Sequence, residues 1–506
     1  MKQFKVNKLA LLVSAAALAL AGCGGGDVSI PGVNYDVSIK ADSTGTPVAQ
    51  VAGTVATLAA ATGADTWQTP AAAAIGVTLL AQLDSSGPDV WDAAKNPVVY
   101  VTSQGTGYSG FISKTQVAPG LAIVNANTYE NVATAQYKAA GVIDGSYSEN
   151  HGLGVSPDGK WIYTQGNMPT SVSDLAGGAV LLVINARTLK IDKIIKSRVH
   201  HVRNIFDANT KKNLVLVDGW GTFFAMDPND NHKVVGSVNP ANLNGAGYLA
   251  FGEPSGQYLF ISVRTGFLES IGGVAIVSLK DWLVKARINT DDASPIWVTF
   301  TADNKLAYVS GGENSTVARI DKSSSLLSDW KMTGIANAGG IGPYGVTLNW
   351  DDKRLFTISK GEASHNQGFS AGIINTASFA EPDQYRGWNT IQSDIYTGCL
   401  RGDHGIVHPD PSKNEMWISC NSSFANVVVG MGDSTKTAPT DGPGGVAVKK
   451  TIPMPNLGSS HNGAFVVYKV SGTTWTGETQ SDTNGLQAGG AANKLAVKAG
   501  TLKVGP

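Results

Sequence analysis

The amino-acid sequence predicts an all-β fold built from repeated, four-stranded antiparallel units. Three observations support this class. The chain of 506 residues contains 60 glycines, spread among short apolar runs as turn residues are. A hairpin pattern returns roughly every 48 residues along the chain. A third apolar run, introduced by glycine, follows each hairpin.

The first element is an N-terminal signal. A basic stretch, "MKQFKVNK", precedes the apolar run "LALLVSAAALAL", which is too short to span a membrane. Residues 1–22 are therefore predicted to be a secretory signal peptide. Its ending, "LAGC", resembles a bacterial lipoprotein signal. The resemblance implies cleavage before Cys23, attachment of lipid to its thiol, and a membrane partner reached through that anchor.

The predicted cellular location depends on the residue that follows Cys23. Gly24 stands where an aspartate is associated with inner-membrane retention, so we expect an outer membrane lipoprotein that faces the periplasm or the cell surface. An ordinary secreted protein is the alternative. In residues 23–70, "GGGDVSIPG" is typical of a flexible tether. The rest of that segment is rich in Ala, Thr and Val, and a tether, an added strand and a small cap all remain open.

The hairpin signal is clearest in "HGLGVSPDGKWIY", from His151 to Tyr163. Proline followed by Asp-Gly predicts a tight turn between two antiparallel strands. An earlier copy fits between Ile75 and Gly105. Comparable hairpins begin at His201, Tyr248, Ile296, Tyr344 and His404.

The third strands include "GGAVLLVINART" and, for the last unit, "GAFVVYKV". Four short strands in roughly 48 residues match one blade of a propeller. Residues 71–485 are therefore predicted to form a seven-bladed β-propeller with four-stranded antiparallel blades. Residues 486–506 contain strand-like runs that either close the ring or pack on its outside.

A family resemblance supports this fold. "SPDGKWIY", "NKLAYVS" and "KRLFTIS", each followed by an apolar strand, resemble the YVTN-type propeller superfamily. That superfamily includes lactonase-like enzymes, the haem d1 domain of cytochrome cd1, and the propellers of nitrous oxide reductase and thiocyanate dehydrogenase. The resemblance covers about residues 70–480. It specifies the fold more closely than the function, because the matching residues are turn and core positions.

Histidines open several of these repeats. The first strand of a propeller blade lies beside the central channel, so a residue that opens it lies at the channel mouth. His461 falls in the expected connection between strands two and three of the last blade, which folds over the same mouth. Imidazole is a common ligand of copper, iron and zinc. The predicted metal ligands are therefore His151, His200, His201, His404 and His461.

Five neighbours complete the candidate site. Glu149 and Asp403 are expected to orient histidine rings or to serve as ligands themselves. Tyr248 and Tyr344 stand at strand entrances where a full copper cluster would need histidines, so the resemblance to copper propellers implies a smaller copper site. A haem d1-like macrocycle is the other cofactor that it allows. Arg203 is the fifth neighbour. For each histidine alone, hydrogen bonding to an adjacent loop is the structural alternative.

Two further cysteines, Cys399 and Cys420, flank a predicted hairpin. In an oxidising compartment such a pair is expected to form a disulfide.

These observations lead to one function and two alternatives. The leading hypothesis is an envelope-anchored propeller that binds a transition metal, copper preferred, and acts as a periplasmic oxidoreductase. One alternative is a non-catalytic scaffold that binds an envelope protein. The other is a lactonase-like hydrolase that uses His151, Arg203 and Glu149. The formal net charge of −1 argues against a nucleic-acid partner.

Overall fold

The computed structural model describes residues 34–41, 47–54, 64–103, 120–139, 152–166, 178–219, 221–265, 272–361, 368–377, 379, 391–423, 425–435, 445–454, 460–482 and 485–486. Cys23, Glu149 and His151 lie outside these ranges, as do the signal peptide and nearly all of the C-terminal tail.

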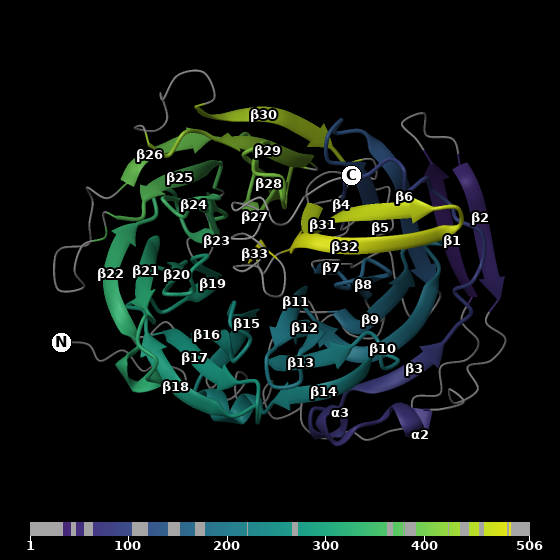
Figure 1. The fold of residues 1–506 in the computed structure, drawn as a ribbon, viewed down its shortest axis with the longest axis horizontal. Helices are drawn as coiled ribbons and strands as arrows, with labels where there is room; N and C mark the ends of the chain where they lie inside the picture. The colour runs from purple at the N-terminus through teal and green to yellow at the C-terminus, as the bar shows by residue number, and fades with distance from the viewer. Residues whose placement is uncertain are drawn as a thin grey trace, which may run out of the picture.

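The described residues form seven sheets, which are arranged in a ring around a common centre (Figure 1). Five of the sheets have four antiparallel strands that follow one another along the chain. In each, the first strand lies nearest the centre and the fourth at the rim (Figure 1). The fold is therefore a β-propeller, as the repeat predicts. The five sheets are β11 (His201–Asp207), β12 (Lys212–Gly219), β13 (Thr222–Asp227) and β14 (Lys233–Val238); β15 (Ala246–Gly252), β16 (Tyr258–Arg264), β17 (Gly273–Ser278) and β18 (Val284–Asn289); β19 (Pro295–Phe300), β20 (Leu306–Gly311), β21 (Thr316–Asp321) and β22 (Lys331–Asn337); β23 (Pro343–Leu348), β24 (Arg354–Ser359), β25 (Ser370–Asn375) and β26 (Ile391–Tyr396); and β27 (Gly402–Val407), β28 (Glu415–Cys420), β29 (Ala425–Met431) and β30 (Val446–Pro453).

Most inner strands are covered on both faces. All six residues of β23, β24, β27 and β28 are buried. Each sheet packs between two neighbours in the ring, which explains strands that are apolar throughout instead of alternating.

The sixth sheet contains β7 (Leu153–Val155), β8 (Trp161–Gly166), β9 (Gly178–Asn185) and β10 (Ile191–Val199). Its first turn is the predicted Pro-Asp-Gly hairpin. Gly159 has a φ of 72°, and Asp158 Oδ1 accepts a hydrogen bond from the Ser156 hydroxyl at 2.6 Å. A fifth strand, β3 (Thr78–Gln82), pairs with β10 at the rim. The prediction that this stretch forms the first strand of a blade is therefore wrong.

The seventh sheet closes the ring with strands from both parts of the chain. β4 (Val98–Ser103), β5 (Gly120–Asn125) and β6 (Asn131–Ala139) follow in order, but the strand on the inner side of β4 is β31 (Ser460–Ser471). The ladder runs from Ser460 opposite Ser103 to Val466 opposite Val98.

β31 contains the sequence "GAFVVYKV", which was predicted to be a third strand of the preceding unit. That third strand is β29 instead. Both are apolar and both follow a turn, so only the hydrogen-bond ladder distinguishes them. β31 pairs with β4 and so closes the ring. The tail beyond Leu486, which was expected either to close the ring or to pack on its outside, lies outside the described residues.

The N-terminal segment lies on the outside. β1 (Asn34–Ala41) pairs with β6, and β2 (Pro47–Thr54) pairs with β1. Two short helices, α2 (Ala64–Trp67) and α3 (Pro70–Ala74), pack beside β14, where the Trp67 indole donates to the Asn231 carbonyl at 3.1 Å. Residues 23–70 therefore contribute added strands, one of the three arrangements that the sequence left open.

The C-terminal hairpin reaches the centre of the ring. β32 (Thr474–Asp482) pairs with β31, and β33 (Gly485–Leu486) pairs with β32 (Figure 1). The Ser481 hydroxyl donates to the Val407 carbonyl at 2.7 Å, and the Asp482 carboxylate accepts from the backbone N–H of Asn204 at 2.6 Å. These contacts place the end of β32 against the innermost strands β27 and β11.

Cys399 and Cys420 form the predicted disulfide, with 5.1 Å between their Cα atoms. It joins the residues that flank the β27–β28 hairpin. Among the residues that the structure describes, no helix has the length and apolar character needed to cross a membrane.

Candidate metal centre

Three histidines from three different innermost strands meet at the mouth of the ring. They are His201 at the start of β11, His404 in β27 and His461 in β31. All three are at most 1% exposed, and each offers one ring nitrogen within 4.8 Å of those of the other two. The ring centroids are 5.0 Å apart for His404 and His461, and 5.8 Å and 5.7 Å from His201 to these two. With His200, they are called the histidine cluster below.

His461 reaches the cluster by a route that the sequence analysis did not foresee. It was expected in a loop that folds over the mouth, but it lies in β31, opposite Thr102 of β4. Its backbone amide donates to the Thr102 hydroxyl at 3.1 Å. β32 pairs with β31 only from Ala464 onward, so at His461 β31 is the strand nearest the centre, as β11 is at His201 and β27 at His404.

Four of the innermost strands, β15, β19, β23 and β27, share an irregularity at this end, whereas β11 pairs regularly with β12. The ladder to the second strand shifts between Gly247 and Ala250 in β15, and again at the matching places in β19, β23 and β27. Such a bulge redirects side chains that a regular strand would send to opposite faces. In β27 it lies at Asp403 and His404, and both side chains contribute to the same site.

Two glycines let neighbouring strands approach the histidines. A Cβ atom on Gly345 would lie 2.6 Å from the Cα of His404, and one on Gly152 would lie 2.3 Å from the His200 carbonyl oxygen. Only glycine allows backbone to approach this closely. The "HGLG" and "PYGV" patterns therefore help to position the adjacent histidines.

Asp403 connects one histidine to a buried cation. Its carboxylate contacts His461 Nε2 and pairs with Lys360 Nζ at 2.8 Å. The Lys360 ammonium also lies 3.8 Å from the centre of the Tyr344 ring. Asp403 is completely buried, so this network fixes the orientation of the His461 ring.

Asp218, near the end of β12, lies beside His201 and a buried cation, as Asp403 lies beside His461 and Lys360. Its Oδ1 accepts from the His201 backbone amide at 3.0 Å, and its Oδ2 pairs with the Arg203 guanidinium. Burial raises the pKa of Asp218, whereas the positive charge of Arg203 lowers it. His200, His201 and Asp218 form a second group whose ligand atoms lie within 4.8 Å of one another.

Burial keeps the histidines in the form that binds metals. The pKa of His200 lies well below its usual value, chiefly because of burial and then because of the positive charge of Lys360. Burial also lowers the pKa of His461, although Asp403 opposes the shift. Both imidazoles are therefore neutral near pH 7, which is the state that offers a nitrogen lone pair.

Aromatic residues on β15, β19 and β23 complete the mouth. Trp297 stacks on His404 with 4.7 Å between centroids and 15° between planes. The Tyr248 hydroxyl donates to the Tyr344 hydroxyl at 3.3 Å, and the Tyr248 ring lies 5.2 Å from that of His200. The two tyrosines were predicted from the sequence, but Trp297 was not, because Ile296 stands at the predicted entrance of its strand.

Asp218, Arg264 and Lys360 were also missed. They share one position in the repeat, at or just beyond the end of the second strand of their sheets: β12, β16 and β24. The Arg264 guanidinium lies 3.4 Å from the centre of the Tyr248 ring. A signal for these residues was present, because "LVDG", "SVRT" and "ISKG" put a charged residue at the same place after an apolar strand.

The chain is similar to known proteins in structure. No family model matches it, and no curated protein matches it. Among solved structures, it is similar to a periplasmic gluconolactonase from Pseudomonas aeruginosa at 13% identity and a TM-score of 0.47, over 73% of this chain and 99% of that one.

It is also similar to the dihydro-haem d1 dehydrogenase NirN at 14% identity and a TM-score of 0.42, over 74% of this chain and 77% of that one. Hydrazine synthase from Kuenenia stuttgartiensis matches at 13% identity and a TM-score of 0.42, over 60% and 86% of the two chains. At this level the likeness concerns the fold alone. The chain is a multi-bladed β-propeller, and its function has to be argued from its own residues.

Proposed function

We propose that the histidine cluster binds a transition-metal ion, copper preferred, and that the protein is a periplasmic oxidoreductase. One observation carries the proposal: His201, His404 and His461 come from three distant parts of the chain, and their ligand nitrogens lie within 4.8 Å of one another in a buried site. Histidine is the commonest metal ligand, and buried titratable groups that gather in one place are typical of functional sites.

The spacing suits a metal ion. Histidine nitrogens bind such ions at about 2.0–2.1 Å, so two ligands of one ion lie at most about 4.2 Å apart. The upper limit of 4.8 Å among the three nitrogens exceeds this by an amount that a small ring movement supplies. Among divalent ions, copper binds most tightly to nitrogen ligands. A bound copper ion would supply one-electron transfer.

The residues around the histidine cluster are suited to support a bound metal ion. Asp403 contacts His461 Nε2, so Nδ1 is the candidate ligand atom of this ring. A carboxylate behind a metal-binding histidine fixes the ring and increases its basicity. The proposal does not extend to a macrocycle, because the histidine rings contact one another and Trp297. We further propose that Cys23 carries the lipid that anchors the protein to the outer membrane.

Metal loading tests the site. The protein is loaded with Cu²⁺, desalted and analysed for metal, and its thermal unfolding is followed with and without copper. We expect about one equivalent and a higher unfolding temperature, since an ion that binds only the native state stabilises it. His404→Ala should lose both effects. The control is His408→Ala, a buried histidine beyond the far end of β27.

Less than about 0.2 equivalents of any transition metal after loading would rule out a dedicated site. Full loading of His404→Ala would place the metal elsewhere. Without a metal site, the propeller would become a candidate scaffold for protein binding.

Asp403→Asn separates the orienting role from stability. We expect copper affinity to fall by about 10- to 100-fold, as for other residues that orient a ligand. The variant also removes the 2.8 Å ion pair of Lys360. The buried ammonium then loses this carboxylate partner, which should lower the free energy of unfolding by about 3–5 kcal/mol. The double variant Asp403→Asn, Lys360→Met should recover stability but not affinity. Recovery of both would contradict the role of Asp403.

A further inference from the structure

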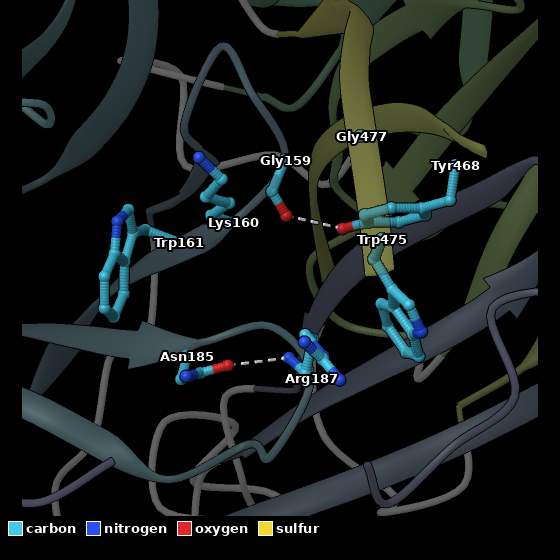
Figure 2. Close-up of a pocket in the computed structure, with 8 residues that line it drawn as sticks. All are labelled: Gly159, Lys160, Trp161, Asn185, Arg187, Tyr468, Trp475 and Gly477. Carbon is cyan, nitrogen blue, oxygen red and sulfur yellow. Dashed lines mark hydrogen bonds between the residues drawn. The ribbon is translucent and has the colours of Figure 1, made fainter. Parts of the chain in front are cut away.

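A pocket on the opposite face of the ring has no part in the proposed metal site. It lies where the β31–β32 hairpin meets the turns of the β7–β10 sheet, and it encloses about 230 Å³ (Figure 2). Drug-sized ligands occupy roughly 300–1,000 Å³, so this pocket is suited to a single ring.

Two tryptophans face the pocket from opposite sides. Trp161 comes from β8 and Trp475 from β32 (Figure 2). Each ring is held by aromatic neighbours. His232 meets Trp161 edge-on at 5.2 Å, and Trp91 meets Trp475 edge-on at 4.8 Å. Both tryptophans are half-buried, so their positions are fixed before any ligand arrives.

The wall between them is closely packed. The Tyr468 hydroxyl donates to the Gly159 carbonyl at 2.7 Å, which joins the hairpins of the two sheets. A Cβ atom on Gly159 would lie 2.9 Å from the Cα of Gly477. The pocket therefore depends on a backbone contact that only glycines permit.

The charged groups of the pocket are balanced. Arg187 pairs with Asp89 at 2.7 Å, and Lys160 pairs with Asp158 at 3.1 Å. Lys193 already lies over the Trp161 ring and Arg187 over the Trp475 ring, at 5.8 Å and 5.4 Å from the ring centres. A cationic ligand is therefore disfavoured, although aromatic walls alone would attract one. Because each cation has a carboxylate partner, an anionic ligand gains little. The remaining class is an uncharged molecule with apolar faces and polar edges.

We propose that this pocket binds one pyranose ring of a neutral sugar. Its C–H groups pack against the half-buried Trp161 and Trp475 side chains, next to the Arg187 guanidinium, which lies 5.4 Å from the centre of the Trp475 ring. Its hydroxyl groups receive hydrogen bonds from Lys160, Arg187 and the Asn185 amide, which line the same space. The site is independent of the metal centre.

Titrations of the full chain test the proposal. The probes are methyl β-glucoside, methyl β-galactoside and N-acetylglucosamine, followed by tryptophan fluorescence and by ligand-observed NMR. At least one should saturate with a Kd in the millimolar range, and Trp475→Ala should weaken it about tenfold or more. Trp282→Ala is the control, since Trp282 lies in the turn between β17 and β18 of another sheet and does not line the pocket.

A second variant covers the case in which Trp475→Ala does not fold. Lys160 is exposed and ends a turn, so Lys160→Met should keep the fold and weaken binding severalfold. The proposal is overturned if no probe saturates below about 100 mM. It is also overturned if binding is unchanged in both variants, or if glucuronate or glucosamine binds more than about tenfold tighter than the neutral probes.

Discussion

At the scale of single residues, buried imidazoles in this protein are held in two different ways. The histidine cluster is surrounded by carboxylates and cations. His232, in contrast, packs against the rings of Trp161 and Tyr163, at 5.2 Å and 5.7 Å. Burial lowers its pKa to about 3, with a smaller contribution from the positive charge of Lys193. His232 is therefore neutral in the native protein over most of the accessible pH range.

This pKa predicts a pH-dependent contribution to stability. Below pH 6.5 the unfolded chain takes up a proton at His232 that the native protein does not, so the free energy of unfolding falls by about 1.4 kcal/mol for each pH unit down to about pH 3. His232→Asn removes this contribution. Asparagine tolerates the left-handed backbone at this position, where φ is 60°.

We expect His232→Asn to be less stable than the wild type at pH 7.5, through lost packing. That difference should shrink by about 2 kcal/mol at pH 5.0, because only the wild type is further destabilised by acid. Urea denaturation at the two pH values measures both differences. If the difference in unfolding free energy between the wild type and His232→Asn is the same at both pH values, the pKa of His232 is not lowered.

At the scale of strands, close contact between neighbouring sheets makes the site sensitive to small changes. Gly345→Ala would place a Cβ atom 2.6 Å from backbone that carries His404. We expect a loss of about 2–3 kcal/mol in unfolding free energy and weaker copper binding, because β23 and β27 must separate.

Gly430→Ala is the matched control for this change. Its Cβ would meet only the Lys449 side chain, at 2.8 Å from Cε, and that side chain is flexible enough to move. Chemical denaturation compares the two variants. Equal stabilities would mean that β23 and β27 can adjust at little cost.

The sequence predicts the repeated hairpins well, because turn residues such as the Pro-Asp-Gly of residues 157–159 act locally. It also places His201 and His404 correctly at the start of innermost strands. It fails for β31, since an innermost strand and a third strand have the same apolar pattern. Trp297 was missed for another reason: the bulge in β19 depends on pairing with β20, which is not a local property.

At the scale of the whole molecule, the ring is closed by a single pairing between distant segments, β4 and β31. A chain that ends after Met454 lacks β31 and leaves β4 with an open edge. We expect it to lose the cooperative unfolding transition of the full chain and to self-associate through this edge. Calorimetry and light scattering are the measurements. One sharp transition at the temperature of the full chain would show that closure contributes little.

β31 also has a consequence for the order in which the protein matures. One end of this strand supplies His461, and the hairpin at its other end supplies Tyr468 and Trp475. A polypeptide that is still being made or exported therefore has neither complete centre, however much of it has already folded. Both are completed only when β31 and β32 have formed. If the two proposals hold, a chain that still lacks these strands binds neither the metal ion nor the sugar.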